Sequence, residues 1–208
     1  MPRPGRDAKR AELLVATHNP GKKQEYLELL APIEAKIRFP DDLDVHLDVR
    51  ETGTTYAENA RKKAESYARA SDMLTLADDS GLEVDALDGA PGIHSARYVV
   101  GSDADRVQAL LSDLHDVPWE ERTARFQCVI VVVTQRGETY EAKGVCEGMI
   151  AYEPVGEAGF GYDPVFYVPD YESTMAQLSR QTKNRISHRA RAARAALPTL
   201  RRVLGESR

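Results

Sequence analysis

Short apolar runs alternate along the chain with segments in which apolar residues recur every three or four positions. Runs at residues 13–16 and 73–77 have the length of buried strands. The second pattern predicts amphipathic helices over residues 22–30, 56–70 and 103–114. Two of these helices begin with capping boxes, formed by Thr55 with Glu58 and by Ser102 with Asp105.

The second half of the chain adds strands that favour a mixed sheet. Residues 125–134 and 139–146 are predicted to form a hairpin, and residues 165–168 a further short strand. A last helix is expected from residue 188 to about residue 197, where Pro198 interrupts it. Since no repeat or long linker divides the chain, we expect a compact α/β domain with a mixed sheet.

Two acids directly follow the predicted strand at residues 73–77. Asp78 and Asp79 would then lie at the carboxyl end of that strand, where ligands of α/β sheets gather. Gly81 would permit a sharp turn there. Such a pair can bind a metal ion and hold a water molecule, but a turn or a cap also accounts for two adjacent acids.

Composition narrows the class of protein. The chain has 208 residues, 42% hydrophobic and 29% charged, as is usual for folded domains. Its longest apolar run, residues 128–133, is far below the roughly 20 residues that cross a bilayer, so no membrane segment is expected. Residues 1–10 are basic and lack an apolar stretch, which predicts a flexible leader before a single domain over residues 11–208, and a cytoplasmic location. Cys128 and Cys146 fit core positions better than a disulfide or metal site.

The net charge of −5 is unevenly distributed. Residues 180–208 are basic, whereas acids are concentrated at residues 41–51 and 78–88. If the fold brings acidic and basic segments together, they suit an anionic ligand held through a divalent cation. Solvated charged faces are the alternative.

Residues 17–22, Thr-His-Asn-Pro-Gly-Lys, follow the first strand and open a helix (the 17–22 loop). Backbone N–H groups, a hydroxyl and the Lys22 ammonium there predict an anion site, or else a plain tight turn. It is not a Walker A loop, because Ala16 replaces the first glycine and Lys23 follows Lys22. Gly159 and Gly161 likewise fall short of a dinucleotide fingerprint.

Glu51 precedes the capped helix and is the partner that could complete an oxygen-rich magnesium site with the Asp78–Asp79 pair. Asn59 and Lys63 share one face of that helix, because they are four residues apart. Lys63 alone would more often be a solvated surface lysine.

Two later segments could bind a nucleoside. Phe160-Gly161-Tyr162-Asp163 offers aromatic rings and an acid in a flexible loop, suited to stacking on a base, although a turn with core aromatics is equally plausible. Ser187-His188-Arg189 opens the last helix shortly after Lys183, so three potential cations converge near a helix N-terminus.

Taken together, these segments closely resemble the inosine triphosphate pyrophosphatase family, also called Ham1-like. The resemblance covers about residues 13–204 and runs through ordered blocks: LVATHNPGK from residue 14, ETG from 51, ENA from 58, ADDSGL from 77, GAPG from 89, SARY from 95, GFGYDP from 159 and SHR from 187. It implies an elongated mixed sheet with two α/β lobes and a nucleotide cleft between them. It also implies Mg²⁺-dependent hydrolysis of ITP, dITP and XTP to the monophosphate and pyrophosphate, in a homodimer.

The same resemblance implies roles for single residues. Asp79 would activate water, and Glu51 and Asp79 would hold Mg²⁺, with Asp78 in support. The triphosphate would be held by Thr17, His18, Asn19, Pro20, Gly21 and Lys22. The rest of the nucleotide site would comprise Lys63, Ser80, Phe160, Gly161, Tyr162, Asp163, Lys183, His188 and Arg189. N–H donors from Arg189 or the loop backbone would favour the purine 6-oxygen over the adenine amino group.

Two rival functions remain at this point. A Maf-like pyrophosphatase would act on other modified nucleotides. A nucleic-acid-binding module could use the Arg-rich C-terminal helix. Overall acidity argues against the second, so no nucleic-acid partner is expected.

Overall fold

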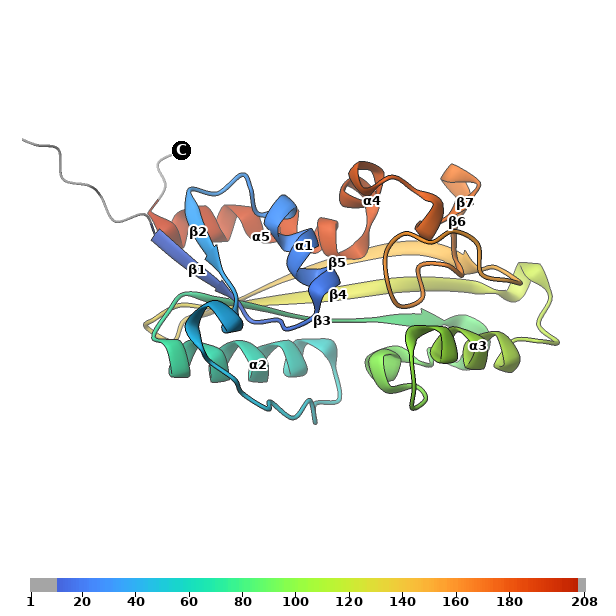
Figure 1. Ribbon diagram of the computed structural model, residues 1–208, viewed down its shortest axis with the longest axis horizontal. Helices are drawn as coiled ribbons and strands as arrows, with labels where there is room; N and C mark the ends of the chain where they lie inside the picture. Colours follow the sequence, from blue (N-terminus) through green and yellow to red (C-terminus); the bar gives the residue numbers. More distant parts are fainter. Residues whose placement is uncertain (1–10, 206–208) are drawn as a thin grey trace, which may run out of the picture.

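The computed structural model describes residues 11–205, and the expected leader lies outside these residues. They form one seven-stranded sheet with helices on both faces (Figure 1). The strands are β1 (Ala11–Val15), β2 (Ala35–Arg38), β3 (Thr75–Val84), β4 (Thr123–Val133), β5 (Thr139–Ile150), β6 (Phe166–Val168) and β7 (Ser173–Thr174). The helices are α1 (Pro20–Leu29), α2 (Tyr56–Ser71), α3 (Asp103–Asp113), α4 (Arg180–Ile186) and α5 (His188–Leu204), with short 3-10 turns between them.

The sheet is mixed, as predicted. Its strand order is β2-β1-β3-β4-β5-β6-β7. β1 pairs in parallel with β2 and β3, and every later pair is antiparallel. The β3–β4 ladder runs unbroken from Thr75 opposite Val133 to Val84 opposite Ala124. The long strands β3, β4 and β5 therefore extend along the whole molecule (Figure 1).

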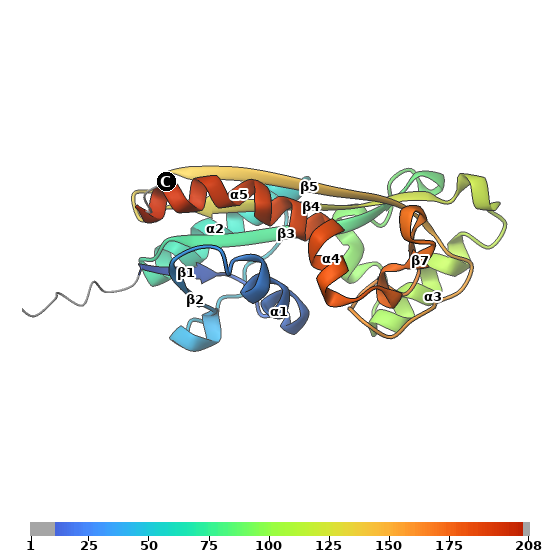
Figure 2. The same ribbon diagram turned by 90° about the horizontal axis from the view of Figure 1, so that it is seen from above.

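Three hydrophobic clusters surround this sheet. One lies under α1 and α5 and includes Tyr26, Ile130 and Leu200. A second lies under α2, on the opposite face at the same end of the sheet. The third, which includes Leu110 and Phe166, packs α3 and β6 at the other end. Figure 2 shows the resulting elongated shape, with β1, β2 and α1 toward one end and α3 and β7 toward the other.

The expected turn after residue 77 is wrong. β3 continues through Asp78 and Asp79, which lie in its middle opposite Ile130 and Val129. Pairing with β4 continues there because both carboxylates find polar partners, described below. Gly81 serves close packing instead of a turn, since a Cβ at this position would collide with the Gly92 carbonyl oxygen.

The expected break at Pro198 is also wrong, because α5 is one helix through it. Pro198 lies on the exposed side of the helix. Ala196 and Leu200, on either side of Pro198, are buried against the sheet and keep the helix packed there. The short elements β2 and α4 were not predicted. Among the described residues, no helix has the length and apolar character needed to span a bilayer.

Candidate active site

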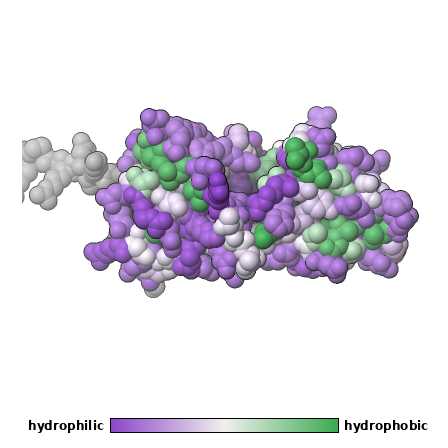
Figure 3. Space-filling model, turned by 90° about the horizontal axis from the view of Figure 1, so that it is seen from below, coloured by the Kyte–Doolittle hydropathy of each residue, from purple (hydrophilic) through white to green (hydrophobic). Residues whose placement is uncertain are grey.

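A cleft of about 320 Å³ lies midway along the molecule, between its two ends. This volume is within the ~300–1,000 Å³ usual for small-molecule sites. The surface seen from the side of α2 and α3 is hollowed there (Figure 3). Predicted residues that line it are Thr17, Asn19, Lys22, Glu51, Lys63, Asp79, Ser80, Phe160, Gly161, Tyr162, Asp163, Lys183, His188 and Arg189. His18, Pro20 and Gly21 are not among its lining residues, whereas Ser95, Ala96, Asp103, Arg106 and Phe126 are additions.

The 17–22 loop is shaped by its own hydrogen bonds. The Asn19 side chain caps α1 by accepting from the Lys22 N–H at 3.0 Å, and the Asn19 N–H donates to Thr17 Oγ1 at 3.2 Å. Pro20 occupies the first turn of α1, where no N–H is required. Gly21 allows the 160–163 segment to approach, because a Cβ there would lie 2.5 Å from Phe160 Cδ1. The loop thus presents Thr17, Asn19 and Lys22 to the cleft.

Asp78 is a buried anion held by cations. Its Oδ2 lies 2.9 Å from Lys22 Nζ and 3.3 Å from Arg189 Nε. Burial alone would raise the pKa of Asp78, but attraction by Lys22 and Arg189 outweighs it and lowers that pKa. Asp78 therefore stays ionised and ties α1 and α5 to β3.

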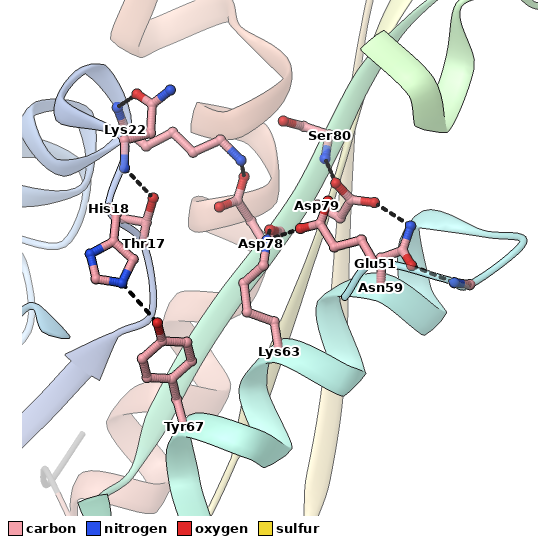
Figure 4. A network of polar contacts seen from close by, with 12 residues as sticks. Thr17, His18, Lys22, Glu51, Asn59, Lys63, Tyr67, Asp78, Asp79 and Ser80 are labelled. Carbon is pink, nitrogen blue, oxygen red and sulfur yellow. Dashed lines mark hydrogen bonds and ion pairs between the residues drawn. The ribbon is translucent and has the colours of Figure 1, made fainter. Parts of the chain in front are cut away.

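Asp79 has a different environment, on the side of β3 that faces α2. Its Oδ2 accepts from Asn59 Nδ2 at 3.1 Å, and Asn59 is itself fixed by accepting from the Gly53 N–H at 2.7 Å (Figure 4). Burial, reinforced by the negative charge of Glu51, raises the pKa of Asp79. A carboxylate with a raised pKa is a stronger proton acceptor than an ordinary aspartate.

Glu51 reaches the same part of the cleft. Its carboxylate is 2.5 Å from Lys63 Nζ and 3.6 Å from Arg97 Nη1. Burial acts to raise the pKa of Glu51, but Lys63 outweighs it, so the pKa is lowered. Lys63 is directed inward and also donates to the Asp78 carbonyl, so it is not a solvated surface lysine.

Glu51 and Asp79 fit a hard divalent cation. Both are partly buried carboxylates in one cleft, and the negative charge of Glu51 disfavours ionisation of Asp79. A cation between two such groups relieves this repulsion, and Mg²⁺ prefers oxygen ligands completed by water and phosphate oxygens.

The 160–163 segment is held rigidly. Lys183 Nζ is 2.5 Å from Asp163 Oδ2 and 4.9 Å from the centre of the Phe160 ring. Asp163 also accepts from the Phe160 N–H at 2.9 Å. Tyr162 is buried, and its hydroxyl donates to the Ser95 carbonyl at 2.9 Å, so only Phe160 of the two aromatics is placed to stack on a base.

Two residues of the Ser187-His188-Arg189 segment have surroundings that differ from those expected. Burial, reinforced by Arg189 and Lys183, holds the pKa of His188 well below its usual range, so His188 is neutral and not one of three cations. Its ring stacks on Phe126 at 4.6 Å, and its Nδ1 has no hydrogen-bond partner among the described residues. The Arg189 side chain is already engaged by Asp78, by Ser80 Oγ at 2.9 Å and by Glu25.

Glu25 is the polar residue that the sequence did not reveal. It is a buried acid on α1, 2.6 Å from Arg189 Nη1 and 2.9 Å from Lys183 Nζ. Its sequence neighbours on α1 carry no local signal of this role. Ser95, Asp103 and Arg106 were also missed as cleft residues, although Asp103 holds the Gly161 N–H at 2.7 Å across the cleft.

Solved structures resemble this fold along almost its whole length. The Staphylococcus aureus Ham1 protein has a TM-score of 0.82 and 41% identity, covering 94% of this chain and 100% of that one. A HAM1 protein from Coxiella burnetii also has a TM-score of 0.82 and 41% identity, covering 95% and 100%. The fold is thus the expected α/β architecture with an elongated mixed sheet.

Sequence relatives point to the same group. A dITP/XTP pyrophosphatase of Desulforamulus reducens is 47% identical over 194 residues, which is 92% of this chain and 96% of that protein. A dITP/XTP pyrophosphatase of Bacillus subtilis is 45% identical over 181 residues, which is 86% and 91%. The sequence model of the Ham1 family matches residues 13–199. The chain therefore belongs to the Ham1 family.

Proposed function

We propose that this protein hydrolyses noncanonical purine nucleoside triphosphates, namely ITP, dITP and XTP, to the monophosphate and pyrophosphate. The relatives named dITP/XTP pyrophosphatase support this substrate class. The observation that carries the proposal is the charge arrangement of one nucleotide-sized cleft, in which Lys22 and Lys63 converge with the carboxylates of Glu51 and Asp79. A triphosphate brings about four negative charges, and cleavage requires their neutralisation as pyrophosphate leaves.

Asp79 is the residue that would act on water. Its raised pKa and its fixed hydrogen bond to Asn59 suit a carboxylate that orients a water molecule toward the α-phosphorus and accepts its proton. Lys22 and Lys63 would neutralise charge on the phosphate oxygens. Glu51 and Asp79 would hold Mg²⁺, which supplies further charge neutralisation and lowers the pKa of a bound water.

The base would lie near Phe160 and His188. Phe160 offers a ring face, and neutral His188 offers a buried ring nitrogen that no described residue contacts by a hydrogen bond. A donor there would pair with the 6-oxygen of hypoxanthine or xanthine and would be left unpaired against the amino group of adenine. Leaving such a group unpaired costs about 1–3 kcal/mol, which favours ITP over ATP. Guanine also carries a 6-oxygen, so its exclusion must depend on its 2-amino group.

The test is pyrophosphate release from ITP, dITP, XTP, GTP and ATP, with and without Mg²⁺. We expect fast Mg²⁺-dependent release from the first three and slow release from GTP and ATP. Asp79→Asn should be inactive, and the matched exposed variant Asp88→Asn should match the parent. Equal turnover of GTP and ITP would refute the proposed base selection. A modified pyrimidine triphosphate in the panel tests the Maf-like alternative.

The proposal extends to the whole assembly. Residues 11–208 would act as a single catalytic domain, in a homodimer located in the cytoplasm. Sedimentation equilibrium of the purified chain tests the dimer, because a monomer at all concentrations would contradict it.

A further inference from the structure

A cluster of two histidines and an aspartate lies beside the cleft, outside its lining residues. His18 Nδ1 is 3.0 Å from Asp41 Oδ1, and the rings of His18 and His46 stack at 6.0 Å with 23° between their planes. One ligand atom from each of the three residues lies within 4.8 Å of the other two. Among residues 11–205, no other group of three or more His, Cys, Asp or Glu side chains meets this criterion.

The two imidazoles are oriented by groups on their outer sides. His18 Nε2 lies 2.8 Å from the Tyr67 hydroxyl, which donates to the Leu47 carbonyl at 3.3 Å (Figure 4). With that proton directed to Leu47, the Tyr67 oxygen accepts from Nε2–H. In the neutral ring, His18 Nδ1 then presents a lone pair to the Asp41 carboxylate, and either a proton on Nδ1 or a metal ion can bridge these two acceptors.

His46 has an equivalent outer partner. Its Nε2 lies 3.2 Å from Asp44 Oδ1, so Nδ1 is the ring nitrogen that could bind an ion. Protein metal sites commonly fix a ligating histidine in this way, through a hydrogen bond from its other ring nitrogen. The two outer contacts are thus what a pair of metal-binding imidazoles requires.

The backbone that carries His46 is held by apolar side chains that pack against the core. Leu43, Val45, Leu47 and Val49 pack against the hydrophobic cluster under α2. The alternate residues Asp44, His46 and Asp48 are polar and lie between these anchors. Lys23 neutralises the second oxygen of Asp41, which leaves Oδ1 facing His18.

We propose that His18, Asp41 and His46 bind a divalent transition-metal ion of the Zn²⁺ type, separate from the Glu51–Asp79 pair. Two imidazoles and a carboxylate suit Zn²⁺, Co²⁺ or Ni²⁺ and not Mg²⁺, which prefers oxygen ligands only. In a tetrahedral site, ligand atoms about 3.4 Å apart surround the ion, so the observed separations need only small side-chain rotations. Water would fill the fourth position because all three residues are exposed.

The ion would join the 17–22 loop to the loop after β2. His18 lies between Thr17 and Asn19, both of which line the cleft. Binding would therefore restrain the loop that, in the proposed function, faces the substrate phosphates.

The test measures Zn²⁺ and Co²⁺ binding directly, independently of activity. Metal-free protein is dialysed against Zn²⁺ in excess Mg²⁺, so that the carboxylate pair is occupied by Mg²⁺, and Co²⁺ is followed by its visible absorption. We expect one ion per chain in the parent and in His115→Ala, which removes an exposed histidine elsewhere. His46→Ala should lose the ion, and Tyr67→Phe should bind it about 10–100-fold more weakly, as loss of an outer hydrogen bond does.

Three results would overturn the proposal: no Zn²⁺ retained in excess Mg²⁺, equal affinity in His46→Ala and the parent, or loss of the ion in Asp79→Asn but not in His46→Ala. Circular dichroism of each variant separates loss of the site from loss of the fold. Because the readout is metal content, the result is independent of which nucleotides the protein hydrolyses.

Discussion

Lys22 and Asp78 form an ion pair of 2.9 Å between a lysine on the first turn of α1 and an aspartate in the middle of β3. Asp78 is also bound by Arg189 of α5, so one carboxylate joins three elements that are distant in the sequence. Within residues 11–205, the neighbouring Asp79 forms no such ion pair and accepts a hydrogen bond from Asn59 instead. The two adjacent acids therefore have different environments: Asp78 holds two cations, whereas Asp79 lines the cleft.

Asp78→Asn should destabilise the protein by about 3–5 kcal/mol at pH 7, because it removes the buried carboxylate that pairs with both Lys22 and Arg189. The pKa of Asp78 is lowered in the folded state, so its contribution is present above the unfolded pKa of about 4 and is lost as pH falls below it. The gap between parent and variant should therefore narrow in acid. Urea unfolding at pH 7 and at lower pH measures this gap, and a gap independent of pH would contradict the assignment.

Asp79 should titrate above the usual aspartate range in metal-free protein, because burial and then Glu51 raise its pKa. Glu51→Gln removes one of these causes and should lower the pKa of Asp79. Carboxyl ¹³C NMR of the parent and the variant checks this. An unchanged or higher value in Glu51→Gln would mean that the two carboxylates do not interact.

Lys63→Met should lower kcat/KM for ITP about 100-fold or more, the usual effect of removing one preorganised group that stabilises developing negative charge. Lys62→Met is the matched control, because the adjacent Lys62 is exposed and donates to Thr52, outside the cleft lining. Steady-state pyrophosphate release from both variants tests the difference. Similar losses in the two variants would indicate a general effect of charge on α2.

Gly144→Ala should displace α5. A Cβ on Gly144 would collide with the His188 carbonyl oxygen and the Ala192 nitrogen, which are backbone atoms that cannot rotate away. We expect a loss of about 1–3 kcal/mol in unfolding free energy, typical of overpacking, together with a raised KM because His188 begins α5. Lys143→Ala, on the exposed neighbour, is the control in urea unfolding and kinetic assays.

Local patterns in the sequence predicted the elements that depend on local interactions. The capping residues Thr55 and Ser102 do begin helices α2 and α3, and the hairpin of β4 and β5 lies where alternation placed it. The course of the chain at Asp78 could not be read this way. Two adjacent acids locally favour a turn. Asp78 can lie in a buried strand only because Lys22 of α1 and Arg189 of α5 pair with its carboxylate.

Residues chosen for their position in a motif are the ones that the structure brings together. Thr17, Lys22, Glu51 and Asp79 do line one cleft. Predictions based on residue type alone were less reliable, because environment decides charge: His188 is neutral through burial, and Tyr162 is bound to the Ser95 carbonyl. Glu25 depends on a tertiary contact with Lys183 that no local pattern contains.

The unbroken ladder between β3 and β4 bears on how the cleft can open. Continuous strands join the two ends of the molecule. A hinge rotation between these ends would have to break the β3–β4 pairing at Asp78 and Asp79, beneath the cleft. Entry and exit of a ligand must instead depend on loops and side chains above the sheet, such as the Phe160 ring lying against Gly21. The paired strands at the floor of the cleft are then rigid and keep the carboxylates of Asp78 and Asp79 in place. The motion needed for ligand exchange is left to the surrounding loops and side chains.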